Sequence, residues 1–490
     1  MIETSSMQLL EALHRHARDM PRKVAVREVA MDGVGKVRTY EELVEGVGHV
    51  AGHLSNVIPA GSVVLLCAAN TCDFHVAFLA ALCGGFSVYP FSPDAAEPEL
   101  IAASTRSRAS AVIATAKILN LLHDRVQAAL SIDDLMGEPI LGQPMCDHVE
   151  PVPTLLLQTS GTTGHPGIVK RPAGTVDAVS RNMVEAIGWC SSDHVLATLP
   201  LCHSYGLEHG LLAPLLSGAT VHLCRSFDLA TVLHEMQHAG ITLFPGVPSI
   251  FEMVGRLADD SVNFASLRTA YSAGAVLPPR VSDMMMTRFG LRLGQVYGAT
   301  EVGSITFNDP HAASFDPGSA GLPMRDVVIR IVTSSGVPAL RGTEGHVQIS
   351  APSMFSGYVG GDGTEVINGY FSAGDIARLS PGGHLTLTGR HKLLIDVGGL
   401  KVNPIEVEQL LLEHPSVGEC VVVPVALSAT VNRLKAVIIP RQHNLPPAAD
   451  ELTRFARARL TAYKVPRLFE FRASLPKTAT GKVLRHLIEA

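Results

Sequence analysis

The sequence predicts an α/β protein with a large N-terminal domain, made of two α/β subdomains and a small β subdomain, followed by a small α+β C-terminal domain. Two observations support this fold class. The chain has 490 residues, 47% apolar and 17% charged, which is too long for one core and too apolar for a disordered protein. Strand-like and helix-like patterns also alternate through its first half, as in the βαβ units that build a parallel sheet.

The first subdomain is expected to alternate helices with buried strands. Capping chemistry and apolar periodicity predict, in order, a helix opened by the capping box Thr39-Tyr-Glu-Glu42, a strand at Ser62–Cys67, a helix at Asp73–Leu82, a strand at Ser87–Tyr89, a helix near Glu97–Ser104 and a strand at Ala111–Ala114. A second set of such units is expected from about Leu155 to Val296.

The sequence pattern changes in the rest of the chain. From Asp309 to Leu387, short strands broken by glycine and proline predict the small β subdomain. We expect a boundary after Gly389, with residues 1–389 in the N-terminal domain and 390–490 in the C-terminal one. The first C-terminal element expected is a helix with Asn403 as its N-cap, Pro404 at its first position and Val407, Leu410 and Leu411 on its buried face. It is followed by strands at Cys420–Val423 and Leu434–Ile439, a helix at Asp450–Leu460 and a loop at Pro476–Lys482.

Composition argues against several classes of protein. A formal net charge of −6 is unsuited to broad binding of nucleic acid or anionic membranes. The N-terminus carries acids where a signal peptide is basic and resembles an amphipathic helix, and no apolar run is long enough to span a bilayer. We therefore expect a cytoplasmic protein whose scattered cysteines are reduced core residues: Cys67, Cys72, Cys83, Cys146, Cys190, Cys202, Cys224 and Cys420.

The stretch from Leu155 to Gly167 ends an apolar run in a loop of glycines and small hydroxyl residues. Such a loop suits a polyphosphate, because hydroxyl groups donate hydrogen bonds and glycines let backbone N–H groups approach closely. The donors are Ser160, Thr162 and Thr163, and the glycines are Gly161, Gly164 and Gly167. The loop does not fit the G-x-x-x-x-G-K-[ST] pattern, and a flexible hairpin turn is the alternative interpretation of the segment taken alone.

Further segments follow in a set order: Thr159-Ser-Gly-Thr-Thr-Gly164, Pro200-Leu-Cys-His-Ser-Tyr-Gly206, Tyr297-Gly-Ala-Thr-Glu301, Gly374-Asp375, Gly389-Arg390 and Pro476-Lys-Thr-Ala-Thr-Gly-Lys482. Together they resemble the acyl-adenylating superfamily, which unites acyl-CoA synthetases, firefly luciferase and the adenylation domains of nonribosomal peptide synthetases. The resemblance covers nearly the whole chain. It implies that a carboxylate attacks the α-phosphorus of ATP, that pyrophosphate leaves, and that a thiol captures the acyl-AMP.

The resemblance also implies roles for matching residues. The β- and γ-phosphates would be held by the loop residues Thr159, Ser160, Gly161, Thr162, Thr163 and Gly164. Tyr297 would stack on adenine beside Gly274 and Ala275, and Asp375 and Arg390 would face the ribose. Thr300 would touch the α-phosphate, Glu301 would hold Mg²⁺, and Lys482 would reach the substrate carboxylate and the α-phosphate. Other interpretations are a core aromatic for Tyr297, surface carboxylates for Glu301 and Asp375, and a solvated charge for Lys482.

The acyl group would be bound near His203, which in this family borders the acyl tunnel and the thiol entry, although a hydrogen-bonded core histidine is an alternative. Other expected pocket residues are Ser204, Phe244, Gly246, Val247, Ser272 and Gly298. They suggest an acid with an uncharged aliphatic or aromatic tail. No carboxylate stands where amino-acid-activating relatives pair with the substrate ammonium, although Glu208 lies close in sequence.

One position departs from the family. Where most relatives carry a lysine after the loop proline, this chain has Gly167, and the nearest cations are Lys170 and Arg171. Loss of that charge should weaken binding of the γ-phosphate unless Lys170 folds back over the loop. We therefore count Lys170 among the expected ATP-binding residues.

The C-terminal domain is expected to be mobile, because Lys482 and a thiol-entry loop containing Gly398 and Gly399 must reach one active site at different steps. Lys392 matches the family's hinge position, with an exposed linker lysine as the alternative.

The leading hypothesis for the function is an acyl- or aryl-CoA synthetase that uses ATP, Mg²⁺ and CoA. The alternatives are a stand-alone adenylation enzyme that loads the phosphopantetheine of a carrier protein, and a non-catalytic nucleotide-binding protein.

Overall fold

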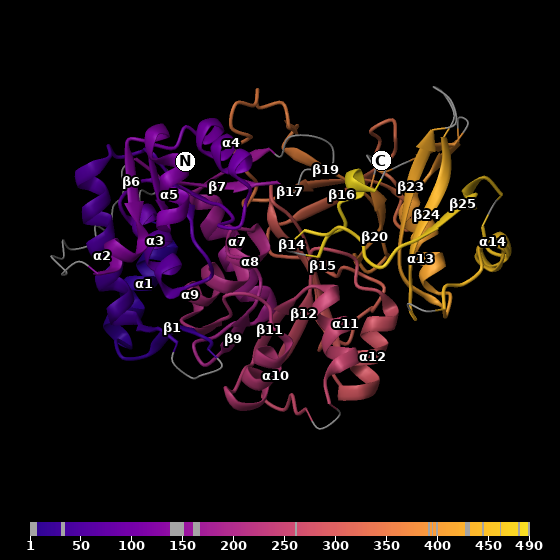
Figure 1. The fold of residues 1–490 in the computed structure, drawn as a ribbon, viewed down its shortest axis with the longest axis horizontal. Coiled ribbons are helices and arrows are strands. Elements are labelled where there is room, and N and C mark those ends of the chain that lie inside the picture. Colours follow the sequence, from indigo (N-terminus) through magenta and orange to yellow (C-terminus); the bar gives the residue numbers. More distant parts are fainter. Residues whose placement is uncertain are drawn as a thin grey trace.

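The computed structural model describes residues 7–30, 35–137, 151–159, 167–259, 262–390, 393, 395–397, 400–426, 432–442, 445–460, 462–478 and 481–488. Figure 1 shows large sheets with their helices in the N-terminal part of the chain and a smaller group of strands near the C-terminus. This confirms the predicted fold class. No helix within the described ranges combines the length and the hydropathy needed to cross a bilayer.

The first large sheet of the described chain has six strands in the order β6-β5-β3-β4-β7-β8. They are β3 (Val63–Cys67), β4 (Ser87–Pro90), β5 (Ala111–Ala114), β6 (Ala128–Ser131), β7 (Thr154–Gln158) and β8 (Ile168–Pro172). Its helices are α2 (Tyr40–Val57), α3 (Cys72–Cys83), α4 (Glu97–Ser107), α5 (Ala116–Leu122) with the 3₁₀ turn η1 (His123–Arg125), and α6 (Ile132–Gly137). Strands β7 and β8 are antiparallel and flank the predicted phosphate loop.

The second large sheet has nine described strands in the order β15-β14-β13-β12-β11-β9-β10-β1-β2. They are β1 (Val24–Glu28), β2 (Val37–Thr39), β9 (His194–Ala197), β10 (Thr220–Leu223), β11 (Leu243–Gly246), β12 (Thr269–Ser272), β13 (Leu293–Ala299), β14 (Gly303–Asn308) and β15 (Leu322–Pro323). The helices nearby in sequence are α1 (Gln8–Asp19), α7 (Ala173–Ile187), α8 (Ser204–Leu207), the π-helix η2 (Glu208–Leu212), α9 (Ala213–Ser217), α10 (Leu229–His238), α11 (Pro248–Leu257) and α12 (Pro279–Phe289).

The remaining strands form smaller sheets. The β subdomain consists of β16 (Val328–Val332), β17 (Gly345–Ser350), β18 (Val366–Ile367), β19 (Tyr370–Leu379) and β20 (Leu385–Arg390). The C-terminal part contains the pair β21 (Ile395–Val397) and β22 (Leu400–Val402), and the sheet of β23 (Val417–Ala426), β24 (Asn432–Pro440) and β25 (Leu468–Phe471). Its helices are α13 (Pro404–Leu412), α14 (Ala449–Arg457) and the 3₁₀ turns η4 (Ala462–Lys464) and η5 (Arg485–Leu487).

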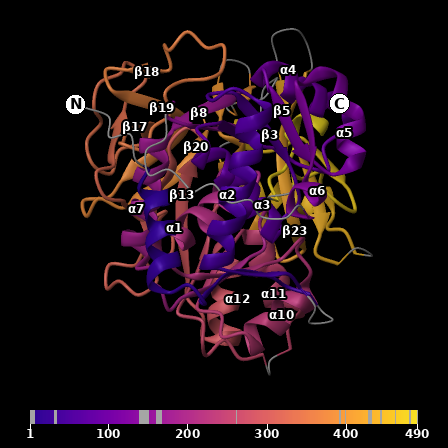
Figure 2. The same ribbon diagram turned by 90° about the vertical axis from the view of Figure 1, so that its left-hand side faces the viewer.

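Local sequence signals account for many of these elements. Thr39 and Glu42 form the predicted capping box of α2, and Asn403 caps α13 ahead of a proline at its first position. Every residue of α3 is buried, as expected of a helix that is apolar on all sides. Figure 2 shows α2 and α3 beside each other in front of the sheet, and they are in contact.

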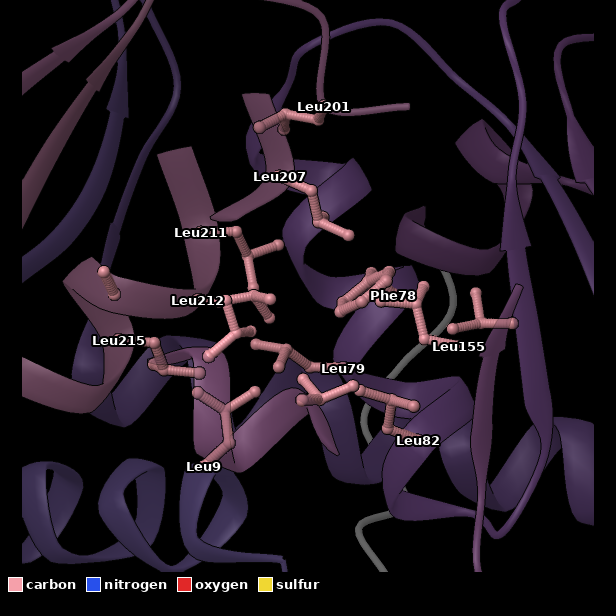
Figure 3. Close-up of a cluster of buried hydrophobic side chains, with 14 of the residues drawn as sticks. Leu9, Phe78, Leu79, Leu82, Leu155, Leu201, Leu207, Leu211, Leu212 and Leu215 are labelled. Atoms are coloured by element: carbon pink, nitrogen blue, oxygen red, sulfur yellow. The ribbon is translucent and has the colours of Figure 1, made fainter. Parts of the chain in front are cut away.

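The central core joins the two large sheets. Figure 3 shows leucines from α1, from α3 and from the segment α8–η2–α9 pointing toward one another, with Leu155 of β7 beside them. Packing of this kind tolerates small displacements poorly, because protein interiors are close-packed. The two α/β subdomains therefore share one packed core beneath the loops at their strand ends.

Three details of the sequence interpretation are wrong. The second set of units does not begin near Leu155, because β7 and β8 join the first sheet, whereas β1 and β2 join the second. Cys190 is exposed, although the other described cysteines are buried; Cys146 lies outside the described residues. Leu410 of α13 is only half-buried, whereas Val407 and Leu411 are buried as predicted.

Candidate active site

An acid, a phenol and a guanidinium meet where β13, β19 and β20 come together. The hydroxyl of Tyr297 donates to Asp375 Oδ2 at 2.7 Å, and Arg390 Nε donates to Asp375 Oδ1 at 2.5 Å. Asp375 lies opposite Arg390 in the β19–β20 ladder and follows Gly374, which adopts a φ of +73°. Such a φ favours glycine over residues with a Cβ atom. The predicted ribose-facing residues Asp375 and Arg390 therefore lie together.

Burial shapes the electrostatics of this trio. Burial raises the pKa of the Tyr297 hydroxyl, and the negative charge of Asp375 raises it further. Burial lowers the pKa of the Arg390 guanidinium, but the Asp375 carboxylate outweighs it, so that the pKa is raised overall. Asp375 is 5% exposed and Tyr297 is 7% exposed. Tyr297 is thus a neutral hydrogen-bond donor whose ring is mostly covered, and its stacking on adenine stays a prediction.

Glu301 follows the end of β13 and is held from the loop after β17. The Tyr358 hydroxyl donates to Glu301 Oε1 at 2.7 Å, and Phe355 N donates to the Glu301 carbonyl at 2.7 Å. A single carboxylate fits Mg²⁺, which proteins commonly bind with one or two carboxylates plus substrate phosphates. No group of three or more potential ligating side chains lies together in the described part of the chain. A magnesium ion at Glu301 would be held by this carboxylate together with phosphate oxygens of the nucleotide.

The same tyrosine packs closely against Gly167. A Cβ atom built on Gly167 would lie 3.0 Å from Tyr358 Cδ1, which is tighter than ordinary van der Waals contact. The ring of Tyr358 therefore packs over the backbone of Gly167, at the end of the predicted phosphate loop. At the base of this loop, Thr159 Oγ1 accepts from Gly167 N and Thr159 N donates to Gly167 O, both at 2.9 Å.

Lys482 reaches this region from the C-terminal part of the chain. Its loop is closed by hydrogen bonds from Thr478 N to Lys482 O and from Lys482 N to Thr478 Oγ1. Gly481, with a φ of +78°, packs so closely on the start of α11 that a Cβ atom there would lie 2.9 Å from Ser249 Oγ. Burial lowers the pKa of Lys482 to about 8; Arg390 lowers it as well, while Asp375 and Glu301 oppose the shift. The lysine thus shares the electrostatic environment of the predicted nucleotide site.

Two of the predicted acyl-pocket residues, Gly246 and Ser272, lie at the carboxyl ends of the adjacent parallel strands β11 and β12. Gly246 of β11 pairs with Ser272 of β12, and the Tyr205 hydroxyl donates to Gly246 O at 3.1 Å. Phe244 and Val247 are buried; Ser272 Oγ is buried without a hydrogen-bond partner in the described structure. Burial lowers the pKa of His203, so the imidazole is neutral at pH 7.

The other predicted residues divide into two groups. Thr300, Gly274, Ala275 and Gly298 are wholly or partly exposed near the same strand ends, and Lys170 is half-buried in β8 with its backbone bonded to the 356–357 loop. The second group lies outside the described residues: Ser160, Gly161, Thr162, Thr163, Gly164, Lys392, Gly398 and Gly399. Their roles stay predictions.

Two charged residues near the phosphate loop do not have the roles left open by the sequence. Arg171 is 0% exposed and its Nη1 donates to Glu208 Oε1 at 2.8 Å, with Glu208 2% exposed. Arg171 therefore does not replace the missing loop lysine, and Glu208 is not available to pair with a substrate ammonium. The Arg171–Glu208 pair and the bond from Tyr358 to Glu301 join residues far apart in the sequence, and the expected departure at Gly167 is the one signal in the sequence that points to this region.

We expect Tyr358→Phe to raise the Mg²⁺ concentration needed for half-maximal activity by about 10-fold, because residues that hold a metal ligand contribute on this scale. The phenylalanine would keep the packing over Gly167 and lose only the hydrogen bond to Glu301. A magnesium titration of initial rates at saturating ATP measures the effect. Tyr370→Phe is the control, because Tyr370 is half-buried at the start of β19 and its ring packs against Arg330, and it should leave the titration unchanged.

The comparisons with protein families, with known sequences and with solved structures agree with one another. The family model described as AMP-binding enzyme matches residues 13–359, and that of the AMP-binding enzyme C-terminal domain matches residues 406–482. Feruloyl-CoA synthase from an Amycolatopsis species is 32% identical, covering 96% of each chain. Oxalate–CoA ligase from Arabidopsis thaliana is 28% identical, covering 88% of each chain. ATP-bound MatB from Rhodopseudomonas palustris shares the fold with a TM-score of 0.91 at 22% identity, covering 99% of this chain and 98% of the other.

Proposed function

This chain belongs to the family of AMP-binding enzymes, and we propose that it is an AMP-forming acid–thiol ligase that activates a carboxylic acid with ATP and transfers the acyl group to CoA. The observation that carries the proposal is the arrival of Lys482, from the C-terminal part, in the electrostatic environment of Arg390, Asp375 and Glu301. These residues lie far apart in the sequence. Their proximity supports a site in which Lys482 and Arg390 neutralise the negative charge of a polyphosphate.

The chemistry needs neutralisation and alignment more than proton transfer. A carboxylate has a reference pKa near 4, so it is already ionised at neutral pH and attacks the α-phosphorus without a general base. Charge builds up on the transferring phosphoryl group, where fixed cations stabilise it most in a site that excludes water. We assign this role to Lys482, with Arg390 held by Asp375 beside it. A Mg²⁺ ion held by Glu301 would supply further neutralisation.

The nucleotide would lie along the strand ends that carry these groups. The hydroxyl-rich loop starting at Thr159 would bind the β- and γ-phosphates, and Asp375 would accept from the ribose hydroxyls. Neutral Tyr297 would present the uncovered part of its ring to the base. Binding in this order leaves the α-phosphate beside Thr300 and within reach of Lys482.

For the thiol acceptor we favour CoA, because the similarity to feruloyl-CoA synthase covers 96% of the chain and residues 406–482 match the AMP-binding enzyme C-terminal domain. Carrier-protein phosphopantetheine is the alternative acceptor. The substrate would be a small acid with an uncharged tail. The buried Phe244 and Val247 support an apolar wall, and burial of Glu208 against Arg171 argues against recognition of an amino acid.

A carboxylate-dependent exchange of labelled pyrophosphate into ATP tests the adenylation half-reaction. A hydroxamate-trapping screen of aromatic and aliphatic acids with ATP and Mg²⁺ would identify the acid. Addition of CoA or of a holo carrier protein to the resulting adenylate then distinguishes the acceptors. Failure of every acid to support exchange would contradict the proposal.

We expect Lys170→Ala to raise the Michaelis constant for ATP a few-fold and to leave kcat nearly unchanged. Lys170 and Arg171 are the cations nearest to the predicted phosphate loop in the sequence, and Arg171 is paired with Glu208. A half-exposed lysine contributes modestly through solvent-screened charge. Initial rates at varied ATP measure the constant, with Lys117→Ala on the outer surface of α5 as the control. An unchanged constant would remove Lys170 from the site.

A further inference from the structure

Glu208 is the meeting point of a buried hydrogen-bond network under the candidate site. Its Oε1 accepts from Arg171 Nη1 at 2.8 Å and from Ser204 Oγ at 2.7 Å. Its Oε2 accepts from Ser304 N at 3.1 Å and from Ser304 Oγ at 2.9 Å. A buried carboxylate that accepts four hydrogen bonds is well compensated, and each bond to a charged group is stronger than one between neutral groups.

The hydrogen bonds continue from Glu208 through Ser304 and His209 to Tyr271, and each bond has a defined donor and acceptor. Ser304 Oγ donates to Glu208, so it can accept from His209 Nε2, which lies 3.2 Å away. His209 Nδ1 then accepts from the Tyr271 hydroxyl at 2.8 Å. Burial lowers the pKa of His209 to about 4, so its ring is neutral and has one donor and one acceptor, as this chain of bonds requires. The direction depends on Glu208 being an acceptor at both oxygens.

The partners of Glu208 come from segments that carry different parts of the site. Arg171 lies in β8, the strand that leaves the phosphate loop. Ser204 follows His203 at the start of α8, and Ser304 lies in β14, three residues after Glu301. Tyr271 precedes Ser272 in β12, on the wall of the predicted acyl pocket. The Glu208 side chain is thus connected to β8 after the predicted phosphate loop, to α8 after His203, to β14 near Glu301 and, through His209, to β12 beside the predicted acyl pocket.

Glu208 itself is held rigidly. It begins the π-helix η2, in which Leu211 and Leu212 point into the central core together with Leu207 (Figure 3). His75 Nε2 of the fully buried α3 lies 3.1 Å from Gly210 O of the same turn. π-helical turns are rare and occur frequently at functional sites. The carboxylate therefore has a fixed position from which to orient its partners.

The contact with the Glu301 segment is close enough to transmit small shifts. Gly303 has a φ of +85°, and a Cβ atom there would lie 2.8 Å from Glu208 Oε1 and 2.9 Å from Arg171 Nη2. Backbone therefore packs directly on the ion pair, two residues from Glu301. Arg171 Nε and Nη2 have no hydrogen-bond partner in the described structure, so Glu208 is the group that compensates the buried guanidinium charge.

We propose that Glu208 is a positioning residue for adenylate formation: with Arg171 it fixes the placement of the phosphate-loop strand, the His203 helix and the Glu301 segment relative to one another. This inference rests on the proposed function. It predicts an effect on kcat, because a misplacement of reacting groups by about 1 Å can cost roughly 100-fold in rate. Binding of ATP, which uses many other contacts, should change less.

The test uses Glu208→Gln, Arg171→Met and the double variant in the full-length protein, with thermal unfolding and pyrophosphate exchange measured for each. Glu208→Gln places an amide where Ser304 or Arg171 must donate, so we expect kcat to fall by at least about 10-fold, with the Michaelis constant for ATP within about 3-fold of wild type. The double variant removes both buried charges. We therefore expect its melting temperature to recover above that of either single variant while its kcat stays low.

Glu235→Gln is the control, because Glu235 is also a buried carboxylate, and its partner His222, 2.9 Å away, bonds to His194 and, among the described residues, to none of the partners of Glu208. It should lower the melting temperature and leave kcat unchanged. A folded Glu208→Gln variant with wild-type kcat, or a double variant that recovers both melting temperature and kcat, would overturn the proposal. Absence of exchange in the wild-type chain would instead contradict the proposed function, and the inference with it.

Discussion

Replacing Lys482 with alanine is expected to slow carboxylate-dependent pyrophosphate exchange by about 100- to 1,000-fold, the usual effect of removing one preorganised group that stabilises transition-state charge. The lysine is mostly buried beside Arg390, Asp375 and Glu301, so no bulk ion replaces its charge easily. Thioester formation from supplied acyl-AMP and CoA should change far less, because the phosphoryl chemistry is complete at that stage.

Lys477→Ala is the matched control for this experiment. Lys477 lies on the same loop but pairs with Glu419 at 2.5 Å, within the C-terminal part of the chain. Its loss should leave exchange within a few-fold of wild type, as expected for a partly exposed ion pair. An equal effect of the two substitutions, or an equal effect of Lys482→Ala on both half-reactions, would contradict the role assigned to Lys482.

The second large effect is expected for Asp375→Asn, which should lower kcat/KM for ATP by about 10- to 100-fold, the range for hydrogen bonds to charged groups. Asp375 accepts from both Tyr297 and Arg390, whereas an asparagine has one acceptor oxygen and would direct its amide donors toward one of them. Arg390 would also lose its counter-charge. Kinetics at varied ATP measure the loss.

Asp228→Asn is the control, because Asp228 caps α10 in an exposed position and asparagine caps helices about as well. It should leave kcat/KM for ATP unchanged. If Asp375→Asn behaved like this control, the carboxylate would have no role in nucleotide binding.

Local sequence signals predicted a large part of the fold. The capping box at Thr39, the N-cap at Asn403 and the apolar run of α3 each act over a few residues, so they can be recognised without knowing the rest of the structure. Sheet membership is different. β7 and β1 look like ordinary strands in isolation, and their assignment to the first and second sheet depends on partners distant in the sequence.

The same distinction holds for the candidate site. Gly374-Asp375 and the loop before Lys482 form short motifs, so their residues could be proposed one segment at a time. Tyr358 reaches Glu301 across 57 positions, and Arg171 reaches Glu208 across 37. Nothing local marks such pairs. Arg171 in particular is a charged residue in a strand position that the sequence alone would place near solvent.

The central claim, that a positive charge at Lys482 drives adenylation, is tested most directly by the pH dependence of kcat/KM for ATP, which reports ionisations of the free enzyme. Because burial lowers the pKa of Lys482 to about 8, the lysine is charged below that pH and neutral above it. We predict that kcat/KM falls as pH rises through about 8, and that in Lys482→Arg this basic limb disappears, because arginine stays protonated. A basic limb that is identical in the two proteins would contradict the account.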